Sequence, residues 1–346
     1  MRLSVLGGGN SGMTLAGFFS AVGHEVKLFK NSLKGQARYE NYPVKAKGKL
    51  SFETTIGVVT NDIEEVMGHG EIIFLSVPAY AQDVFFDKLV PFLRPESYLC
   101  LTPDNYGGFR LIEKLRNMGK PPHQRMLSLS SVVFACRKTS EHEVAIKGIK
   151  EEVKVASINN GVLMGGIKQL NAIQRIYRPS ENIFEVLLSN MNPVVHTVTT
   201  LMNAGWIESK QGAFDFYGQG ISPSVAKVIQ TIDDERMAIG CKLDLKLTSL
   251  LENMRILYGI TEVDLHKALS HSRIHTQDLA PKSLKTRYIF EDVPYGLVPM
   301  SEMGKWLRVP TPGIDSIIHL ASMVWERNFK DSVPKELFRY LNRLTS

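Results

Sequence analysis

The chain has 346 residues, of which 44% are hydrophobic and 22% charged, a composition that is typical of a folded globular protein and excludes a disordered or collagen-like chain. The net charge of +6 favours small anionic ligands as partners. The densest basic stretch, 34–49, lacks a recognisable nucleic-acid-binding module, so we expect no nucleic-acid partner.

The length exceeds that of one ordinary core, so we expect two domains, 1–178 and 179–346. Apolar runs such as 72–77 are too short to span a membrane, and Met1 leads into an apolar strand without room for a signal peptide. The three cysteines show no CxxC spacing, so we interpret them as reduced thiols: Cys100, Cys136 and Cys241. We therefore expect a cytoplasmic protein without membrane association, and a homodimer is compatible with the sequence.

Residues 2–29 have the pattern of a strand, a glycine turn, a helix and a second strand. The turn carries the G-x-G-x-x-G spacing, in which the glycines allow the turn, the approach of a pyrophosphate and the packing of helix on strand: Gly7, Gly9 and Gly12. Asn10 and Ser11 begin the helix, whose free N–H groups favour a phosphate at that end. The unit predicts a dinucleotide site in a Rossmann domain.

The end of the second strand distinguishes NAD(H) from NADP(H). An NAD site usually has an acidic residue there, which accepts hydrogen bonds from the ribose 2′-hydroxyl. Here the residues are Lys30, Asn31 and Ser32, which offer a cation and hydrogen-bond donors to a 2′-phosphate. This favours NADP(H) over NAD(H); the alternative interpretation is a solvated basic loop.

Further apolar stretches predict the rest of a parallel, doubly wound sheet: 71–77, 98–102, 126–135 and 153–158. Ligands of such sheets bind beyond the carboxyl ends of the strands. The loops 76–80 and 102–108 are therefore candidate walls of the nicotinamide site, and Val77 and Pro78 are candidate cofactor-binding residues.

From about Pro179 the pattern becomes helical, which predicts an all-α second domain. A helix over 189–208 is apolar nearly all round except for one polar stripe: Asn192, His196, Thr199 and Asn203. The stripe faces either a satisfied internal hydrogen-bond network or a substrate cavity. Because a nucleotide-binding half precedes it and an Arg/Asp pair follows it, we favour the cavity.

Further helices are expected over 222–241, which has a Ser-Pro start, and over 243–257, 262–269 and 311–325. Three histidines invite a metal site, but their spacing matches no known motif, so surface or capping roles are favoured and no metal is expected: His266, His271 and His275.

Residues 287–296 are expected to form a rigid loop that carries Arg287, Glu291 and Asp292 among apolar residues. The simplest structural interpretation is a salt bridge between Arg287 and one of the two carboxylates.

These motifs together resemble the opine dehydrogenase family, which includes octopine and nopaline dehydrogenases. The most restrictive are Asn-Pro-x-x-His at 192–196 and Glu-Asp-Val-Pro-x-Gly-Leu at 291–297, accompanied by 76–80, 203–205, 234–236 and 311–315. The resemblance implies a Rossmann domain, a helical domain and a cleft between them. It further implies reductive condensation of an amino acid amine with a 2-oxo acid through an imine, with NAD(P)H as reductant.

By position, the resemblance makes His196 the catalytic histidine, Asp292 its partner and Arg287 the substrate-binding arginine. Histidine suits proton transfer near neutral pH, and an arginine can hold a carboxylate with two hydrogen bonds. We also expect Asn192 and Asn203 to bind substrate, although Asn192 could instead cap a helix that starts at Pro193. Two departures from the family pattern are the basic end of the second strand and the bulky loop 103–106.

Two other functions compete with this one. A simple NADPH-linked 2-oxo acid reductase, of the ketopantoate reductase type, shares the fold but would typically use a catalytic lysine. A regulatory protein that senses NADP(H) without turnover would need no acid–base pair.

Overall fold

The N-terminal β-α-β unit has the predicted structure. β1 (Arg2–Leu6) and β2 (Glu25–Phe29) pair in parallel, and α1 (Asn10–Ala21) connects them after the glycine turn. The computed structural model describes residues 1–35, 37–272, 278–330 and 333–345. They form two units, Met1–Leu187 and Leu188–Ser346, whereas the sequence places the boundary after residue 178.

The first unit is built on an eleven-stranded sheet with the order β11-β10-β7-β6-β5-β1-β2-β4-β3-β9-β8. The central strands, from β7 to β4 in that order, are parallel. The remaining strands are β3 (Arg38–Gly48), β4 (Phe52–Thr60), β5 (Ile72–Leu75), β6 (Tyr98–Leu101), β7 (Met126–Leu129), β8 (Phe134–Lys138), β9 (Glu143–Ile149), β10 (Val153–Ala156) and β11 (Tyr177–Pro179).

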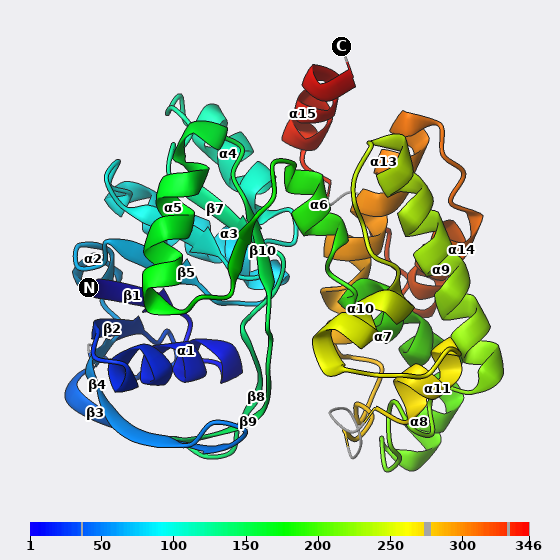
Figure 1. Ribbon diagram of the computed structural model, residues 1–346, viewed down its shortest axis with the longest axis horizontal. Coiled ribbons are helices and arrows are strands. Elements are labelled where there is room, and N and C mark those ends of the chain that lie inside the picture. Colours follow the sequence, from blue (N-terminus) through cyan, green and yellow to red (C-terminus); the bar gives the residue numbers. More distant parts are fainter. Residues whose placement is uncertain (36, 273–277, 331–332, 346) are drawn as a thin grey trace. The chain divides into compact units, whose positions relative to one another are not determined.

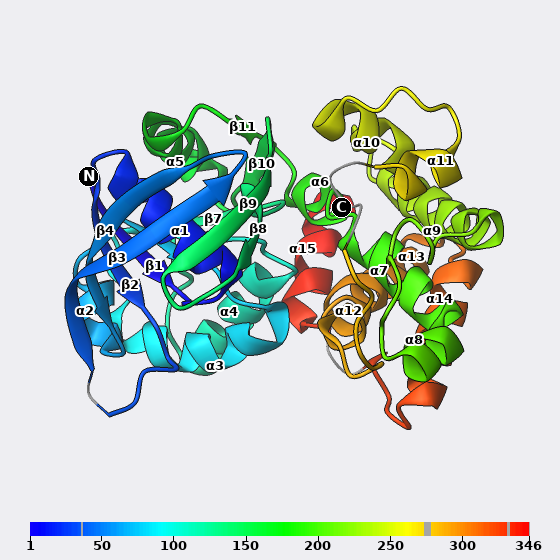
Figure 2. The same cartoon turned by 90° about the horizontal axis from the view of Figure 1, so that it is seen from below.

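Helices cover both faces of this sheet, which confirms the doubly wound Rossmann class. α1 and α5 (Asn160–Ile173) pack on one face, in a core that includes Phe19 and Leu170. On the other face lie three helices and the short η1 (Val90–Phe92): α2 (Ile63–Met67), α3 (Ala79–Leu89) and α4 (Gly107–Asn117). Figure 2 shows α1 and α5 on one side of the strands and α3 and α4 on the other.

The outer part of the sheet differs from the purely parallel expectation. Residues 126–135 are not one strand: β7 and β8 are separate and lie far apart in the strand order. β3 runs antiparallel to β4, β8 runs antiparallel to β9, and these four strands curl around α1 (Figure 1). The densest basic stretch, 34–49, is mainly β3, whose buried residues alternate along the strand and pack on the α1 core: Tyr42, Val44 and Ala46.

The described residues of the second unit are helical apart from loops and an isolated β-bridge between Asp215 and Leu279, and this confirms the predicted class of the C-terminal domain. Its helices follow α6 (Ile183–Leu188), which spans the unit boundary. They are α7 (Asn192–Met202), α8 (Ala204–Lys210), α9 (Pro223–Lys242), α10 (Leu250–Tyr258), α11 (Leu265–Ser270), α12 (Arg287–Phe290), the π-helix η2 (Val293–Leu297), α13 (Val298–Leu307), α14 (Pro312–Val324) and α15 (Lys335–Thr345).

Two segments of this unit differ from the sequence expectation. The helix expected over 189–208 is two helices, α7 and α8, because Asn203 leaves the helical conformation between them. The loop expected over 287–296 consists of two short helices, α12 and η2, joined by a turn at Glu291 and Asp292. Pro294 lies in the first turn of η2, where a missing N–H is tolerated. α7 contacts α9, α12, α14 and η2, which explains why it is apolar nearly all round.

α9 begins as the Ser-Pro pattern predicts. Ser222 is the N-cap and its Oγ accepts a hydrogen bond from the N–H of Val225 at 3.3 Å, with Pro223 at the first helical position. In the part of the chain that is described, no helix combines the length and hydropathy of a membrane span.

Candidate active site

His196 lies in the middle of α7, where its side chain is 7% exposed. Its Nδ1 is 2.8 Å from Asp292 Oδ2, and its Nε2 is 3.1 Å from the Tyr217 hydroxyl oxygen. Its two hydrogen-bond partners come from distant parts of the chain: Asp292 lies at the junction of α12 with η2, and Tyr217 lies in the loop after α8. The histidine is therefore held at both ring nitrogens.

The partners define the state of the ring. The Asp292 carboxylate accepts a hydrogen bond, so Nδ1 carries a proton and donates it. In the neutral ring Nε2 is then the basic nitrogen and accepts a hydrogen bond from Tyr217. When Nε2 gains a proton it donates to the same hydroxyl oxygen, and the carboxylate stabilises the resulting imidazolium. This arrangement suits a group that gains and loses a proton.

Gly296 packs closely against the Pro193 ring beside the His196–Asp292 pair. A Cβ built on Gly296 would stand 2.3 Å from Pro193 Cγ, so only glycine allows η2 to approach the first turn of α7 this closely. His196 lies three residues beyond Pro193 on α7, and Asp292 directly precedes η2. The contact between Gly296 and Pro193 thus helps to place the side chains of Asp292 and His196 close together.

Aromatic rings enclose the histidine. The Tyr288 ring lies 4.2 Å from the imidazole at an interplanar angle of 31°, and it stacks in turn on Phe216 at 5.0 Å. Burial raises the pKa of Tyr288, so its hydroxyl stays protonated near neutral pH. The rings restrict water around the His196–Asp292 pair, which strengthens the electrostatic interaction between them.

Arg287 begins α12, one residue before Tyr288. Its guanidinium lies 5.3 Å from the centre of the Tyr288 ring and 3.8 Å from Glu291 Oε2, and its side chain is 55% exposed. The sequence suggests a salt bridge between Arg287 and a nearby carboxylate, and the long ion pair with Glu291 is such a bridge. The guanidinium still has N–H donors that face solvent. Arg287 therefore stands beside the histidine's stacking partner with the capacity to bind an anion.

The rest of the polar stripe has other contacts. Asn192 is exposed at the start of α7 and is not its cap, because the N-cap position is Met191. Thr199 Oγ1 donates to the Val195 carbonyl at 2.8 Å. The Asn203 amide donates to the carbonyl oxygens of Thr199 and Gly220, each at 2.8 Å, and so joins the end of α7 to the loop before α9.

The glycine turn of the first unit fits a dinucleotide. Gly7 has φ 118°, and a Cβ on Gly12 would stand 1.7 Å from the Gly7 carbonyl oxygen, so both positions require glycine. A Cβ on Gly9 would meet nothing within 4 Å, which leaves the open space that a pyrophosphate needs before the N-terminus of α1. Val77, in the loop after β5, packs beside Gly7, and Pro78 is the N-cap of α3.

Other predicted cofactor residues have partners within the unit. The Asn10 side-chain oxygen accepts a hydrogen bond from the Lys138 N–H at 2.9 Å, and Ser11 contributes to the surroundings of the Cys136 thiol. Lys30 is buried and forms an ion pair with Glu141. The Asn31 side-chain oxygen accepts from Lys88 Nζ at 2.5 Å, while Ser32 is exposed in the turn after β2.

The bulky loop after β6 turns its side chains inward. Asp104 is 1% exposed and accepts a hydrogen bond from the Gly108 N–H at 2.7 Å, while Tyr106 is 2% exposed with φ 61°. Burial raises the pKa of Asp104. The bulk that distinguishes this loop therefore supports the start of α4 and belongs to the interior of the first unit.

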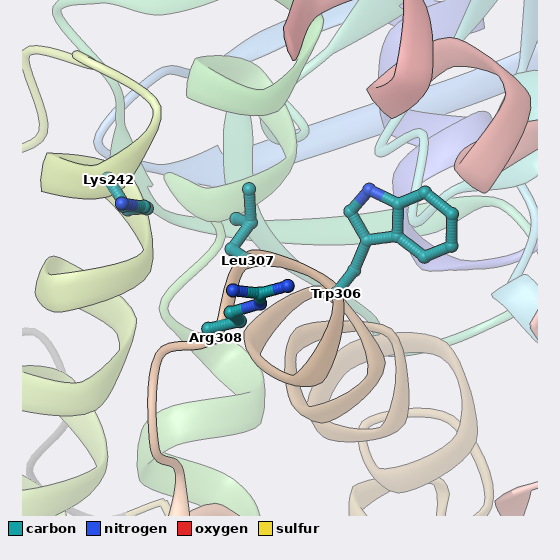
Figure 3. A pocket seen from close by; sticks show the side chains of 4 residues that line it. All are labelled: Lys242, Trp306, Leu307 and Arg308. Carbon is teal, nitrogen blue, oxygen red and sulfur yellow. The ribbon is translucent and has the colours of Figure 1, made fainter.

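Two further features lie outside these clusters. Among the residues that the structure describes, no group of three or more His, Cys, Asp or Glu could hold a metal ion, and His275 lies outside the described residues. A surface hollow of about 290 Å³ is lined by residues from the ends of α9 and α13, none of which belongs to the histidine site: Lys242, Trp306, Leu307 and Arg308 (Figure 3).

Comparison with known proteins decides the family. Residues 179–325 match the domain described as NAD/NADP octopine/nopaline dehydrogenase, alpha-helical domain, and residues 2–102 match the NAD-dependent glycerol-3-phosphate dehydrogenase N-terminus. An opine dehydrogenase from Arthrobacter sp. (strain 1C) is 28% identical over 329 residues, which cover 94% of this chain and 91% of the relative. The helical domain therefore belongs to the octopine/nopaline dehydrogenase family, and the relative that matches most of the chain supports the same assignment.

Solved structures of other opine dehydrogenases share the fold. An octopine dehydrogenase in complex with NADH and agmatine matches with a TM-score of 0.74 and 18% identity, covering 94% of this chain and 89% of the other. A yersinopine dehydrogenase with bound NADP⁺ matches with a TM-score of 0.66 and 14% identity, covering 98% and 95% of the two chains. Both cofactors thus occur in proteins with the fold of this family.

The sequence motifs do not indicate three residues that lie near His196 or Lys30. Tyr217 contacts His196, Tyr288 stacks on it, and Glu141 contacts Lys30. The aromatic run at 214–217 was the available signal for Tyr217, since aromatic residues in a loop between helices need a packing partner. No local pattern marks Glu141, because its partner is 111 residues away.

Proposed function

We propose that this protein uses His196 as the acid–base catalyst in the reductive condensation of an amino acid amine with a 2-oxo acid, with Asp292 as its partner. The reaction class is that of the family, an NAD(P)-dependent oxidoreductase acting on CH–NH bonds. The observation that supports the residue roles best is the buried imidazole held between Asp292 at 2.8 Å and Tyr217 at 3.1 Å.

The chemistry requires proton transfer at more than one step. His196 accepts a proton from the amine as it attacks the carbonyl carbon, and returns a proton to the hydroxyl group that leaves as water when the imine forms. Asp292 holds the ring in the Nδ1–H tautomer and stabilises the imidazolium between these steps. Bound NAD(P)H supplies the hydride that reduces the imine.

Arg287 binds a substrate carboxylate in this proposal. Both substrates carry a carboxylate beside the reacting atom, and a guanidinium holds such a group with two parallel hydrogen bonds. Arg287 is half exposed and lies next to the ring that stacks on His196, so a bound carboxylate would place the reacting carbon close to the acid–base group. Asn192 and Asn203 remain proposed substrate contacts, and the donors of Asn203 already bind backbone carbonyls.

For the cofactor we propose NADP(H) in preference to NAD(H). The support is the absence of an acidic residue directly after β2, where Lys30, Asn31 and Ser32 stand. The cytoplasmic location and the homodimer likewise remain predictions, which cell fractionation and light scattering would test.

The test is nicotinamide oxidation with a 2-oxo acid, with and without a pool of amino acids. We expect NADPH oxidation only when both substrates are present, and splitting the pool then identifies the amine. Oxidation with the oxo acid alone would instead support the simple reductase. His196→Ala should lower kcat by about 100-fold or more, as expected for lost acid–base catalysis, without weakening NADPH binding. An unchanged kcat would contradict the role of His196.

A further inference from the structure

One carboxylate of the Rossmann unit accepts hydrogen bonds from three donors. Glu141 lies in the turn between β8 and β9, and its Oε1 pairs with Lys30 Nζ and accepts a hydrogen bond from the Tyr42 hydroxyl at 2.6 Å. Its Oε2 is 3.1 Å from Lys138 Nζ. Two ammonium groups and a phenol hydroxyl thus converge on a single anionic group, and the Lys30 contact is the main reason that the pKa of Glu141 falls to about 2.

This cluster is attached to the glycine turn at two points. The stem of Lys30 packs against Gly8, where a Cβ would stand 2.6 Å from Lys30 Cγ. The backbone N–H of Lys138 donates to Asn10 Oδ1 at 2.9 Å. Lys30 also directly follows β2, where a Rossmann domain receives the adenosine ribose. The two lysines are therefore positioned relative to the proposed phosphate-binding turn by contacts within one unit.

The donors suit a phosphate at least as well as a carboxylate. Lysine ammonium groups and a hydroxyl are standard ligands of phosphate oxygens, and a phosphate presents more acceptors and more charge than one carboxylate. The Lys30 side chain is only 7% exposed, whereas the Glu141 side chain is 54% exposed in a turn. The Lys30 ammonium is thus held in place, while the carboxylate has solvent into which it can move.

We propose that Lys30, Lys138 and Tyr42 form the subsite for the 2′-phosphate of NADP(H), and that Glu141 is an internal counter-ion which the phosphate must displace. This rests on the proposed nucleotide site and names the residue that limits its selectivity. NAD(H) carries no 2′-phosphate and leaves the Glu141 contacts intact. NADP(H) gains the three donors but loses the contacts of Glu141, so the carboxylate keeps the preference between the two cofactors small.

The test uses adenosine 2′,5′-bisphosphate and adenosine 5′-diphosphate as probes, titrated by calorimetry into the full chain. Glu141→Gln should bind the 2′,5′-bisphosphate about tenfold more tightly, which corresponds to about 1.4 kcal/mol, and should bind the 5′-diphosphate as the wild type does. Lys30→Met should weaken the 2′,5′-bisphosphate selectively. The matched control is Glu143→Gln, because Glu143 lies in the same hairpin but pairs with Lys47, and it should change neither affinity.

Three results would overturn the inference. Unchanged binding of the 2′,5′-bisphosphate by Glu141→Gln would show that the carboxylate does not compete with the phosphate. Weaker binding of the 5′-diphosphate by that variant would assign Glu141 to the ribose hydroxyl groups instead. A wild-type chain that binds neither probe would overturn the proposed nucleotide site itself, and this separates the two failures.

Discussion

At the scale of single residues, Tyr217 is a hydrogen-bond partner of His196 that the sequence motifs do not indicate. Its hydroxyl is the partner of His196 Nε2, the nitrogen that exchanges protons with substrate in the proposed mechanism, whereas Asp292 is the partner of Nδ1. A phenol can serve as donor or acceptor, so it accommodates both protonation states of the ring. We therefore propose that Tyr217 positions the imidazole of His196.

Tyr217→Phe should lower kcat about five- to tenfold, because one hydrogen bond of roughly 1 kcal/mol that orients the imidazole is lost while the ring remains. The pH dependence of kcat should shift as well, since the neutral imidazole loses a donor at Nε2. Steady-state kinetics across pH would measure both effects. A normal pH profile with normal kcat would mean that Tyr217 only fills space.

Arg287→Ala should raise the KM of a carboxylate substrate about tenfold or more, with a smaller effect on kcat, because the lost interaction binds substrate before the chemical step. Lys285→Ala is the matched control: Lys285 is an exposed cation two residues earlier in the same segment. Separate titration of the oxo acid and the amine would show which carboxylate Arg287 holds. Equal KM changes in the two variants would indicate a general charge effect.

At the scale of elements, two neighbouring residues on α9 explain the Asp-Glu-Arg motif. Glu235 accepts hydrogen bonds from the N–H groups of Gly313 and Ile314, at 2.7 and 2.8 Å, and so caps α14 from another helix. Arg236 is fully buried and bonds to Asp233 and to the carbonyl oxygens of Leu188 and Thr248. These contacts hold the framework on which α7 lies.

Glu235→Ala should therefore lower the free energy of unfolding by about 1–3 kcal/mol, since it leaves two helix-end N–H groups without their charged acceptor. Asp234→Ala on the same helix is the control, because Asp234 is exposed and only accepts from Gln230. Its effect should stay within about 0.5 kcal/mol. Thermal unfolding midpoints of the two variants would measure this difference. Equal losses of stability in both variants would contradict the role of Glu235 as a cap of α14.

At the scale of the whole molecule, the pH dependence of the free energy of unfolding has a contribution from Lys150, an inward-facing lysine of the Rossmann unit. Lys150 follows β9, its ammonium donates to Ser131 Oγ, and burial lowers the pKa of the lysine to about 8 from an ordinary value of 10.5. Below pH 8 the group is charged in both the folded and unfolded chain, and the folded state bears the full cost of burying the charge. As pH rises from about 8 to 10.5 this cost disappears, so stability gains.

Lys150→Met should remove that cost and stabilise the protein by about 1–2 kcal/mol at pH 7, with a smaller gain near pH 10. Urea unfolding midpoints at the two pH values would measure the difference. Lys168→Met, on the exposed face of α5, should show no pH-dependent gain. A gain at pH 7 that persists near pH 10 would mean that better apolar packing, rather than the buried charge, is responsible.

Much of this architecture was accessible from sequence because the determining interactions are local. The glycine spacing at 7–12 produces its turn from its own backbone geometry, and the Ser222–Pro223 start of α9 depends on atoms within one helical turn. The split between α7 and α8 and the helical form of 287–297 were missed, because a single departure from helical geometry and a π-helix leave almost no mark on hydrophobic periodicity.

The sequence by itself thus determined the Rossmann unit, the helical second domain and, through two restrictive motifs, the family and the pairing of His196 with Asp292. Tertiary structure alone decided what surrounds the charged groups. Tyr217 reaches His196, Glu141 reaches Lys30 across 111 residues, and four outer strands curl around α1 only in the folded chain. The reason is physical: turns and caps arise from neighbouring residues, whereas the partner of a buried charge is selected by packing between distant segments.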